Sequence, residues 1–284
     1  MVNLRCMDNT MKEFQSIITQ KEGQNNMIAN YHTHTWRCKH AMPSEREYVE
    51  YAIRKGLKIL GFSDHTPMPF PEDHISGARM EINQLEDYVT SILQLKDEYK
   101  NDIEIHLGLE VEFYPEYFEE LLKITGQYPI EYFLLAQHYL GNEINDVYCG
   151  ESTKESMRLI RYCQQTKKAL ATGYFTYFAH PDLINYTGDE VLYESEIRGL
   201  CMYAKERNIP LEINFLGIGD RRHYPNLNFW KIAGEVGNQV IFGSDAHQPE
   251  NVCNSEALSV AEQIVDKYGL ELIDTVTLHN PRII

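Results

Sequence analysis

The sequence predicts a single-domain α/β protein in which seven strand–helix units form a parallel sheet. Short apolar segments rich in β-branched or aromatic residues alternate with longer amphipathic segments along the chain. The strand-like segments also end, one after another, in a histidine or in an acidic or amide residue. Because the carboxyl ends of parallel strands meet on one face of such a fold, potential ligands would gather there. The length of 284 residues suits one domain of this kind or two smaller domains with separate cores, and length alone does not choose between them.

The predicted elements alternate in a regular order. The first helix candidate begins at a capping-box pattern formed by Ser44 and Glu47, and Gly56 stands where it should end. Further amphipathic faces begin near Glu81 and occur at 116–124, 154–170, 190–207, 227–236 and 255–267. The strand candidates occupy residues 27–34, 57–65, 103–112, 131–138, 174–180, 209–214 and 239–247.

Nothing in the sequence marks a boundary between domains. Because there is no Pro/Gly/Ser-rich linker, low-complexity tract or fixed-period repeat, residues 27–284 are predicted to form one domain. Residues 1–26 match no strand or helix in this scheme and are predicted to be a loosely docked extension. They lack the apolar stretch of a secretory signal, and no apolar run is long enough to cross a bilayer. We therefore expect a cytoplasmic protein without a membrane partner.

Charge and cysteine content exclude two further classes of function. The chain has 26 Lys and Arg against 42 Asp and Glu, a net charge of −16, and no basic stripe, so long nucleic acid is not an expected partner. The six cysteines are scattered without a CxxC pair, which predicts reduced thiols. Cys38 lies between candidate ligands, and we interpret it as a bystander in a loop.

Candidate functional residues stand at the ends of the predicted strands. Seven of the eleven histidines belong to this set, if His40 in the first loop is counted. Imidazole and carboxylate groups together suit zinc, manganese or iron, so this convergence predicts a metal-dependent hydrolase. The strand-end residues are His32, His34, Asp64, His65, Glu110, His138, His180, Asn214, Asp245 and His247.

Residue spacing separates ligands from their neighbours. Residues i and i+2 of a strand point to the same side, so His32 and His34 can hold one metal together, and Asp245 and His247 are matched in the same way. The alternative for any one histidine is a solvated strand end. For His138 and His180, each of which follows an apolar run, it is a buried ring satisfied by a backbone hydrogen bond.

The acidic residues receive different interpretations. Asp64 is adjacent to His65 and faces the other way, so we predict a hydrogen-bonding partner of His65 rather than a ligand. Glu110 is the better candidate for a carboxylate that bridges two metals. Glu112 is interpreted as a solvated charge at the edge of the sheet.

A cluster of several metals suits hydrolysis of a phosphate ester. Such clusters activate water and neutralise charge during in-line attack on phosphorus. Arg221 and Arg222 follow the sixth strand on the correct face to bind phosphoryl oxygens, and at least one of them is expected to be a solvated loop charge. His223 is a further candidate substrate contact. The leaving-group acid stays open between a metal-bound water, His223 and a protonated carboxylate.

These segments resemble the polymerase and histidinol phosphatase (PHP) superfamily. The matching segments, in order over residues 30–247, are YHTHT, GFSDHTP, GLEVEF, LLAQHYL, FAHPDL and GSDAH. Within the superfamily, GLEVEFYP, EYFLLAQH and the LEIN strand are similar to the HisK-type histidinol-phosphate phosphatases of histidine biosynthesis. The resemblance implies a distorted, TIM-like (β/α)7 barrel with three divalent metal ions, which would be Zn, Mn or Fe.

The resemblance also implies which residues hold each ion. The first set would be His32, His34, Glu110 and Asp245, the second Glu110, His138 and His180, and the third His40, His65 and His247. Within these sets, the residues that would hold the catalytic metal-bound hydroxide are Asp245, His247 and Glu110. All nine motif ligands are present, which predicts an intact catalyst.

The expected substrate is L-histidinol phosphate, hydrolysed to L-histidinol and phosphate. The sixth-strand loop EINFLGIGDRRHYP departs from the family pattern, and Asn185 stands where some relatives have an arginine. One alternative is therefore another PHP phosphoesterase, with a nucleotide or phosphotyrosine substrate. A non-catalytic metal-binding or regulatory protein is a third, although such a protein should have lost ligands. An amidohydrolase-type barrel would usually need a bridging lysine, and no lysine stands at a predicted strand end.

Overall fold

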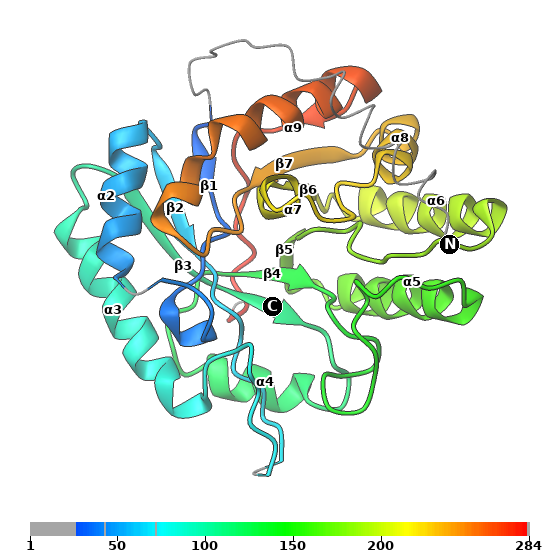
Figure 1. Cartoon of the computed structure of the whole chain (residues 1–284). Coiled ribbons are helices and arrows are strands. Elements are labelled where there is room, and N and C mark those ends of the chain that lie inside the picture. The colour runs from blue at the N-terminus through cyan, green and yellow to red at the C-terminus, as the bar shows by residue number, and fades with distance from the viewer. Residues whose placement is uncertain (1–26, 43, 72, 283–284) are drawn as a thin grey trace, which may run out of the picture.

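A computed structural model describes residues 27–42, 44–71 and 73–282, so the predicted extension 1–26 lies outside the described residues. All eight strands that it shows are parallel and form one sheet in sequence order, with the helices arranged around them (Figure 1). The strands are β1 (Ala29–Asn30), β2 (Ile59–Phe62), β3 (Glu104–Glu112), β4 (Tyr132–Ala136), β5 (Phe175–Phe178), β6 (Leu211–Asn214), β7 (Gln239–Gly243) and β8 (Glu271–Leu272).

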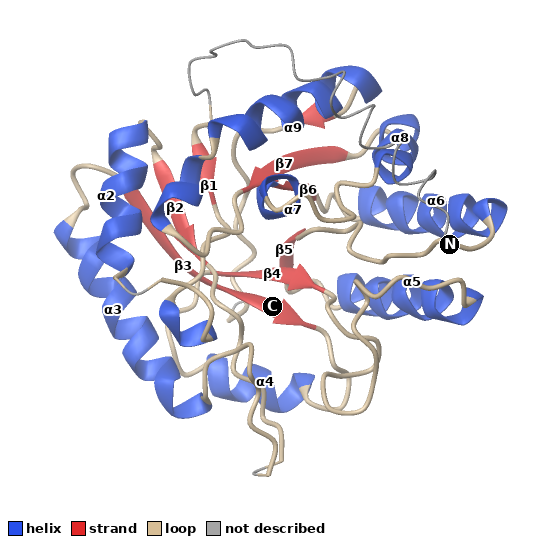
Figure 2. Cartoon of the chain, viewed as in Figure 1, coloured by secondary structure: helices blue, strands red, loops and turns tan. Residues whose placement is uncertain are grey.

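The helices form an outer layer around the sheet (Figure 2). Within the described part of the chain, none is long and apolar enough to span a membrane. The helices are α2 (Glu45–Lys55), α3 (Leu85–Glu98), α4 (Phe118–Thr125), α5 (Ser156–Ala171), α6 (Glu190–Glu206), α7 (Phe215–Gly219), α8 (Leu227–Val236) and α9 (Ser255–Tyr268).

All seven predicted strand–helix units are present, so the TIM-like α/β fold is confirmed. The prediction missed β8, a pair of exposed residues beside the start of β7, because two residues cannot produce a periodic pattern. The predicted capping box of Ser44 and Glu47 was also wrong. The Ser44 side chain makes no cap hydrogen bond, whereas Gly56 ends α2 in the left-handed conformation as expected, with φ of 86°.

The sheet closes at its carboxyl end. Thr33 and Ala246, just beyond β1 and β7, form a parallel bridge. The amide of His34 donates to the Ala246 carbonyl at 3.0 Å, and the Ala246 amide donates to the His32 carbonyl at 3.2 Å. This closure places the two histidines after β1 directly beside the residues that follow β7.

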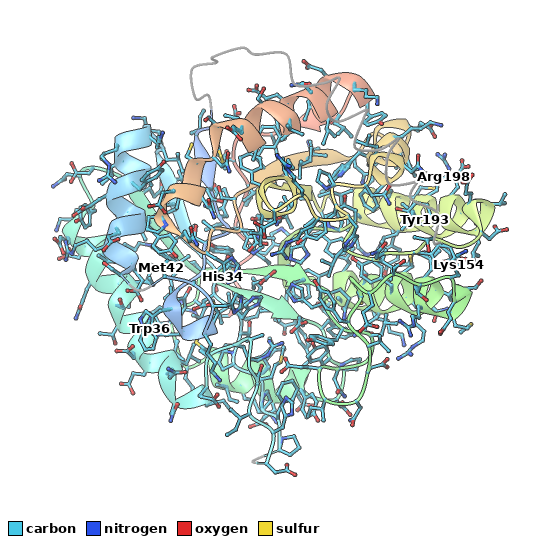
Figure 3. The ribbon with its side chains drawn as sticks, in the orientation of Figure 1. His34, Trp36, Met42, Lys154, Tyr193 and Arg198 are labelled. Atoms are coloured by element: carbon cyan, nitrogen blue, oxygen red, sulfur yellow. The ribbon has the colours of Figure 1, made fainter. Side chains whose placement is uncertain are left out.

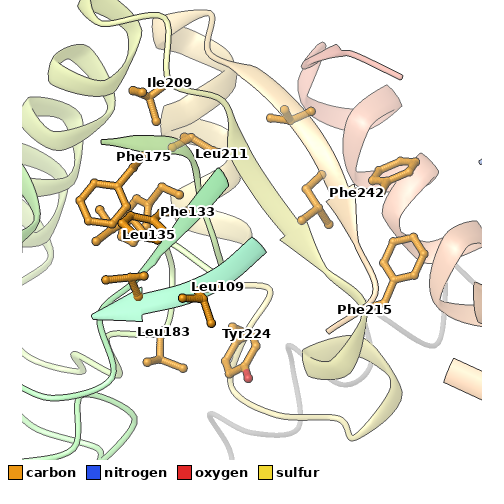
Figure 4. Close-up of a cluster of buried hydrophobic side chains, with 14 of the residues drawn as sticks. Leu109, Phe133, Leu135, Phe175, Leu183, Ile209, Leu211, Phe215, Tyr224 and Phe242 are labelled. Carbon is orange, nitrogen blue, oxygen red and sulfur yellow. The ribbon is translucent and has the colours of Figure 1, made fainter. Parts of the chain in front are cut away.

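Two apolar layers flank the strands because alternate side chains face opposite sides. The larger layer lies between the sheet and the helices, and a part of it that includes Leu109, Phe133 and Leu211 appears in Figure 4. The smaller layer fills the barrel interior and is covered by the C-terminal residues Ile273, Val276 and Leu278. Its buried members are Ala29, Tyr31, Tyr132, Leu134, Tyr177, Ala179 and Ile241.

Tyr132 crosses this interior from β4 toward β1 and β2. Its buried hydroxyl donates to the Tyr31 carbonyl at 2.6 Å and lies 3.2 Å from the Phe62 carbonyl. The ring occupies the space that side chains would take at Gly61 and Gly108, because a Cβ atom at either position would overlap it. Glycine is therefore required here by close packing below the functional face.

We predict that Gly108→Ala destabilises the protein by about 1–3 kcal/mol, the usual cost of overpacking a well-packed interior. The measurement is the free energy of unfolding in urea. Gly77→Ala is the matched control, since a Cβ atom at Gly77 meets no atom within 4 Å. Equal stability of the two variants would contradict this account of the interior.

Candidate metal centre

All nine predicted metal ligands lie together at the carboxyl ends of the strands. The ring centroid of His34 is 4.1 Å from that of His247 and 4.4 Å from that of His65. These three residues come from the ends of β1, β7 and β2, which are far apart in sequence. In Figure 3, His34 lies toward the middle of the ring of helices, whereas Arg198 lies at its periphery.

The first predicted ligand set converges on one point. The Nε2 atoms of His32 and His34 are 3.2 Å apart. They lie 3.5 and 3.0 Å, respectively, from the same oxygen, Oδ1 of Asp245. Two imidazole nitrogens and a carboxylate oxygen at such mutual distances fit around one cation, because each can offer it a lone pair.

Glu110 connects the first and second predicted sets. One carboxylate oxygen, Oε1, lies 2.8 Å from His180 Nε2, 3.7 Å from His138 Nε2 and 3.4 Å from His32 Nε2. The other oxygen lies 2.8 Å from His65 Nδ1. The side chain is only 1% exposed, so imidazoles rather than water surround both oxygens. This is the position that a bridging carboxylate requires.

The third predicted set lies beside these two. The His40 ring centroid is 4.6 Å from that of His247 and 5.5 Å from that of His65. The Nε2 atom of His247 is buried and has no hydrogen-bond partner in the structure, which leaves a lone pair suited to a metal. Cys38 is not a remote bystander, because its buried sulfur lies within 4.8 Å of a nitrogen of His40 and of His247.

The electrostatics of the cluster favour bound cations. Burial lowers the pKa of His65 and of His247 to about 3, so both rings are neutral and can act as ligands. Burial also acts to lower the pKa of His32, but the negative charges of Glu212 and Asp245 outweigh it and raise that pKa well above its usual value. A metal ion held by Nε2 of His32 and by Asp245 would take the place of the proton on that nitrogen.

Two buried carboxylates orient the ligand rings, and the sequence interpretation missed their role. Glu212 lies with Oε2 2.9 Å from Nδ1 of His32, and Glu112 lies with Oε1 3.0 Å from Nδ1 of His138. The prediction of a solvated Glu112 was wrong, because Arg79 covers it and leaves it 1% exposed. A useful signal was present in the sequence: each glutamate is two residues from another polar residue on the same side of its strand.

Asp64 is a buried partner of a ligand, as predicted, but the ring it faces is a different one. Its Oδ1 lies 3.4 Å from Nδ1 of His34, and its Oδ2 accepts the hydroxyl hydrogen of Thr35. From His65 it accepts a hydrogen bond only from the backbone amide, which donates to Oδ1 at 2.7 Å, and not from the ring. The prediction failed because the first loop folds over β2, which the linear sequence does not show.

Six of the nine predicted ligands line a cavity of about 370 Å³. Of the three predicted substrate contacts, only Arg222 lines it. Arg221 is exposed outside the lining, and the His223 ring is turned away, with Nε2 2.7 Å from the Leu183 carbonyl. The other lining residues are His40, His65, Ala78, Arg79, His138, Tyr139, Tyr148, His180, Leu183, Leu216, Asp220, Tyr224, Asp245, His247, Gln248 and Asn251.

Comparison with known proteins places the chain in a family. Residues 30–215 match the family model described as PHP domain. The chain belongs to the PHP domain family. The matched range contains seven of the nine predicted ligands and ends just after β6, so the predicted resemblance is confirmed.

Relatives of this PHP-family chain match it over most of their length. A Deinococcus radiodurans protein named "Probable histidinol-phosphatase" is 30% identical, over 79% of this chain and 88% of its own. The histidinol-phosphatase of Bacillus subtilis is 27% identical, over 78% of this chain and 94% of its own. The histidinol phosphate phosphatase of Lactococcus lactis, solved with Zn, L-histidinol and phosphate, has the same fold, with a TM-score of 0.69 at 19% identity, covering 90% of this chain and 98% of that one.

We predict that Glu212→Gln weakens zinc binding by about tenfold to a hundredfold, because partners of ligating histidines usually contribute that much. Gly243→Ala should have the same effect, since an added Cβ atom would overlap the Glu212 carboxylate. The measurement is a zinc titration of the metal-free protein in competition with a chromophoric chelator. Glu271→Gln, an exposed change on β8, is the control. Wild-type affinity in both site variants would refute the orienting role of Glu212.

Proposed function

We propose that this protein is a metal-dependent phosphatase that converts L-histidinol phosphate and water into L-histidinol and phosphate, a step of histidine biosynthesis. The main support is the convergence of all nine predicted ligands, six of which line a cavity that Arg222 also lines. The names of the curated relatives point to the same reaction. The cavity volume is in the range of sites for small molecules, which favours a small phosphate monoester.

The proposed cofactors are three divalent ions, Zn, Mn or Fe, in the three ligand sets described above. Bound there, the ions would supply a nucleophilic water at neutral pH and offset negative charge on the phosphoryl group. The zinc in the Lactococcus lactis structure supports this choice. Glu110, Asp245 and His247 would hold the ions that activate this water. Glu110 contacts histidines of all three ligand sets, and the other two residues line the cavity.

Arg222 is the proposed contact for the phosphoryl oxygens. Its side chain is 39% exposed and lines the cavity, and its guanidinium is held by Asp220 at 2.8 Å and by the Tyr224 hydroxyl at 3.2 Å. A guanidinium fixed in this way still has N–H groups available for a phosphate. The net charge of −16 would favour approach of a substrate with a cationic amine.

The first test is phosphate release from L-histidinol phosphate by the metal-replete protein, beside nucleotides, sugar phosphates and phosphotyrosine. We expect efficient turnover of histidinol phosphate alone. His138→Ala should lower it by at least about a hundredfold, because it removes a ligand and not merely a ligand's partner. Turnover of only another ester would reject the proposed substrate, and no turnover of any ester would reject the enzyme.

A matched pair of variants tests the phosphate contact. We expect Arg222→Gln to lower kcat/KM about tenfold to a hundredfold, the usual effect of losing a hydrogen bond to a charged group. Arg221→Gln removes the same charge one residue earlier, outside the cavity lining, and should leave kcat/KM unchanged. Steady-state kinetics with histidinol phosphate decide between them, and the reverse ranking would assign the contact to Arg221.

A further inference from the structure

Arg79 is a buried cation in the wall of the cavity. It belongs to the segment that joins β2 to α3, and its side chain is only 4% exposed although it is a lining residue. Its guanidinium contacts Glu112 through Nη2 and Glu143 through Nε at 2.8 Å, and Nη1 donates to the Thr66 carbonyl at 3.2 Å. Arg79 is neither one of the predicted metal ligands nor the proposed phosphate contact.

Its hydrogen-bonding capacity is largely used within the protein. Of the five N–H groups of a guanidinium, four are engaged here, because Nη2 also donates to Glu143 at 2.5 Å. Arg222, which also lines the cavity, is in contrast 39% exposed. The surroundings of Arg79 therefore indicate a residue that organises the wall and does not bind the phosphate.

The contacts of Arg79 lead directly to a metal ligand. Glu112 accepts from Arg79 through Oε2, and its other oxygen, Oε1, lies 3.0 Å from Nδ1 of His138. The opposite nitrogen of that ring, Nε2, points to Glu110 at 3.7 Å. A carboxylate buried to 1% exposure needs a compensating charge, and Arg79 provides it while fixing which oxygen faces the histidine.

Arg79 also joins two loops around this ligand. Glu143 is located in the connection between β4 and α5, which also provides the cavity residues Tyr139 and Tyr148. It contacts Arg79 at 2.5 Å and His74 at 3.2 Å. One guanidinium thus ties together the end of β3, the segment after β2 and the segment after β4.

We propose that Arg79 is a positioning residue for the metal ligand His138, acting through Glu112. The guanidinium holds one carboxylate oxygen, so that the other accepts the Nδ1 hydrogen and directs Nε2 toward the second ligand set. This role rests on the metal centre of the proposed function. It predicts that loss of Arg79 weakens one metal site selectively.

Zinc titration of the metal-free protein against a chromophoric chelator, without substrate, tests the proposal. For Arg79→Met we expect one of the bound zinc ions to lose about tenfold to a hundredfold in affinity, with the others unchanged. Arg79→Lys keeps the charge but not the planar fork, so it should be intermediate. The Arg79→Met/Glu112→Gln double variant should bind zinc no less tightly than the single variant with the lower zinc affinity. The two effects should not add, since both substitutions break the same contact.

The matched control is Arg198→Met. Arg198 also pairs with two carboxylates, Glu194 at 2.8 Å and Glu235 at 2.6 Å, but it lies on the peripheral helix α6 (Figure 3). Its loss should leave every zinc affinity at the wild-type value. The free energy of unfolding in urea, measured for both variants, shows whether any zinc effect merely follows stability.

Kinetics at limiting and excess zinc separate positioning from substrate binding. With histidinol phosphate and p-nitrophenyl phosphate, Arg79→Met should turn over slowly at limiting zinc and recover at excess zinc with an unchanged KM. Normal zinc affinity with a raised KM would overturn the proposal in favour of a direct substrate contact. Equal weakening of all zinc ions in step with stability would overturn it in favour of a purely structural role. Selective zinc loss without turnover of either ester by the wild type would support the positioning role and reject the proposed function.

Discussion

The burial of one carboxylate, Glu110, is the constraint on which the rest of the site depends. A carboxylate without water is stable only when cations or donors surround it, and the end of β3 places this one among four histidines from four other strands. A parallel sheet can meet this need because all its carboxyl ends face the same way. The bridge between Thr33 and Ala246 then closes the ring, so that the ligands after β1 and β7 become neighbours.

Further buried carboxylates contact the Nδ1 atoms of two of the predicted ligand rings, on the side away from the metal centre. Glu212 holds His32 and Glu112 holds His138, while a network through Arg79 compensates Glu112. Together with Glu110 and Asp245, these carboxylates carry more negative charge than Arg79 can offset. This excess explains why the site suits divalent cations, and why those cations would contribute to stability as well as to chemistry.

Much of the fold and of the ligand set could be predicted from the sequence. The seven strand–helix units were predicted because the apolar period changes clearly between strands and helices. Most of the candidate ligands were predicted because they stand at the ends of apolar runs, as His138 and His180 do, whereas His40 was included because it follows the first pair of histidines so closely. The errors concern contacts between loops: Glu112 was taken as solvated because the arginine that covers it is 33 residues away, in a segment without any periodic pattern.

What the sequence alone determined is the membership of the PHP domain family, the order of the elements and the set of candidate ligands, since these follow from local pattern and motif spacing. Tertiary structure decided which ring each acidic residue faces, as Asp64 facing His34 illustrates, and which of two adjacent arginines enters the cavity. It also decided that Glu112 and Glu212 are buried. The physical reason is that burial and side-chain direction depend on segments far away in the chain, which no window along the sequence contains.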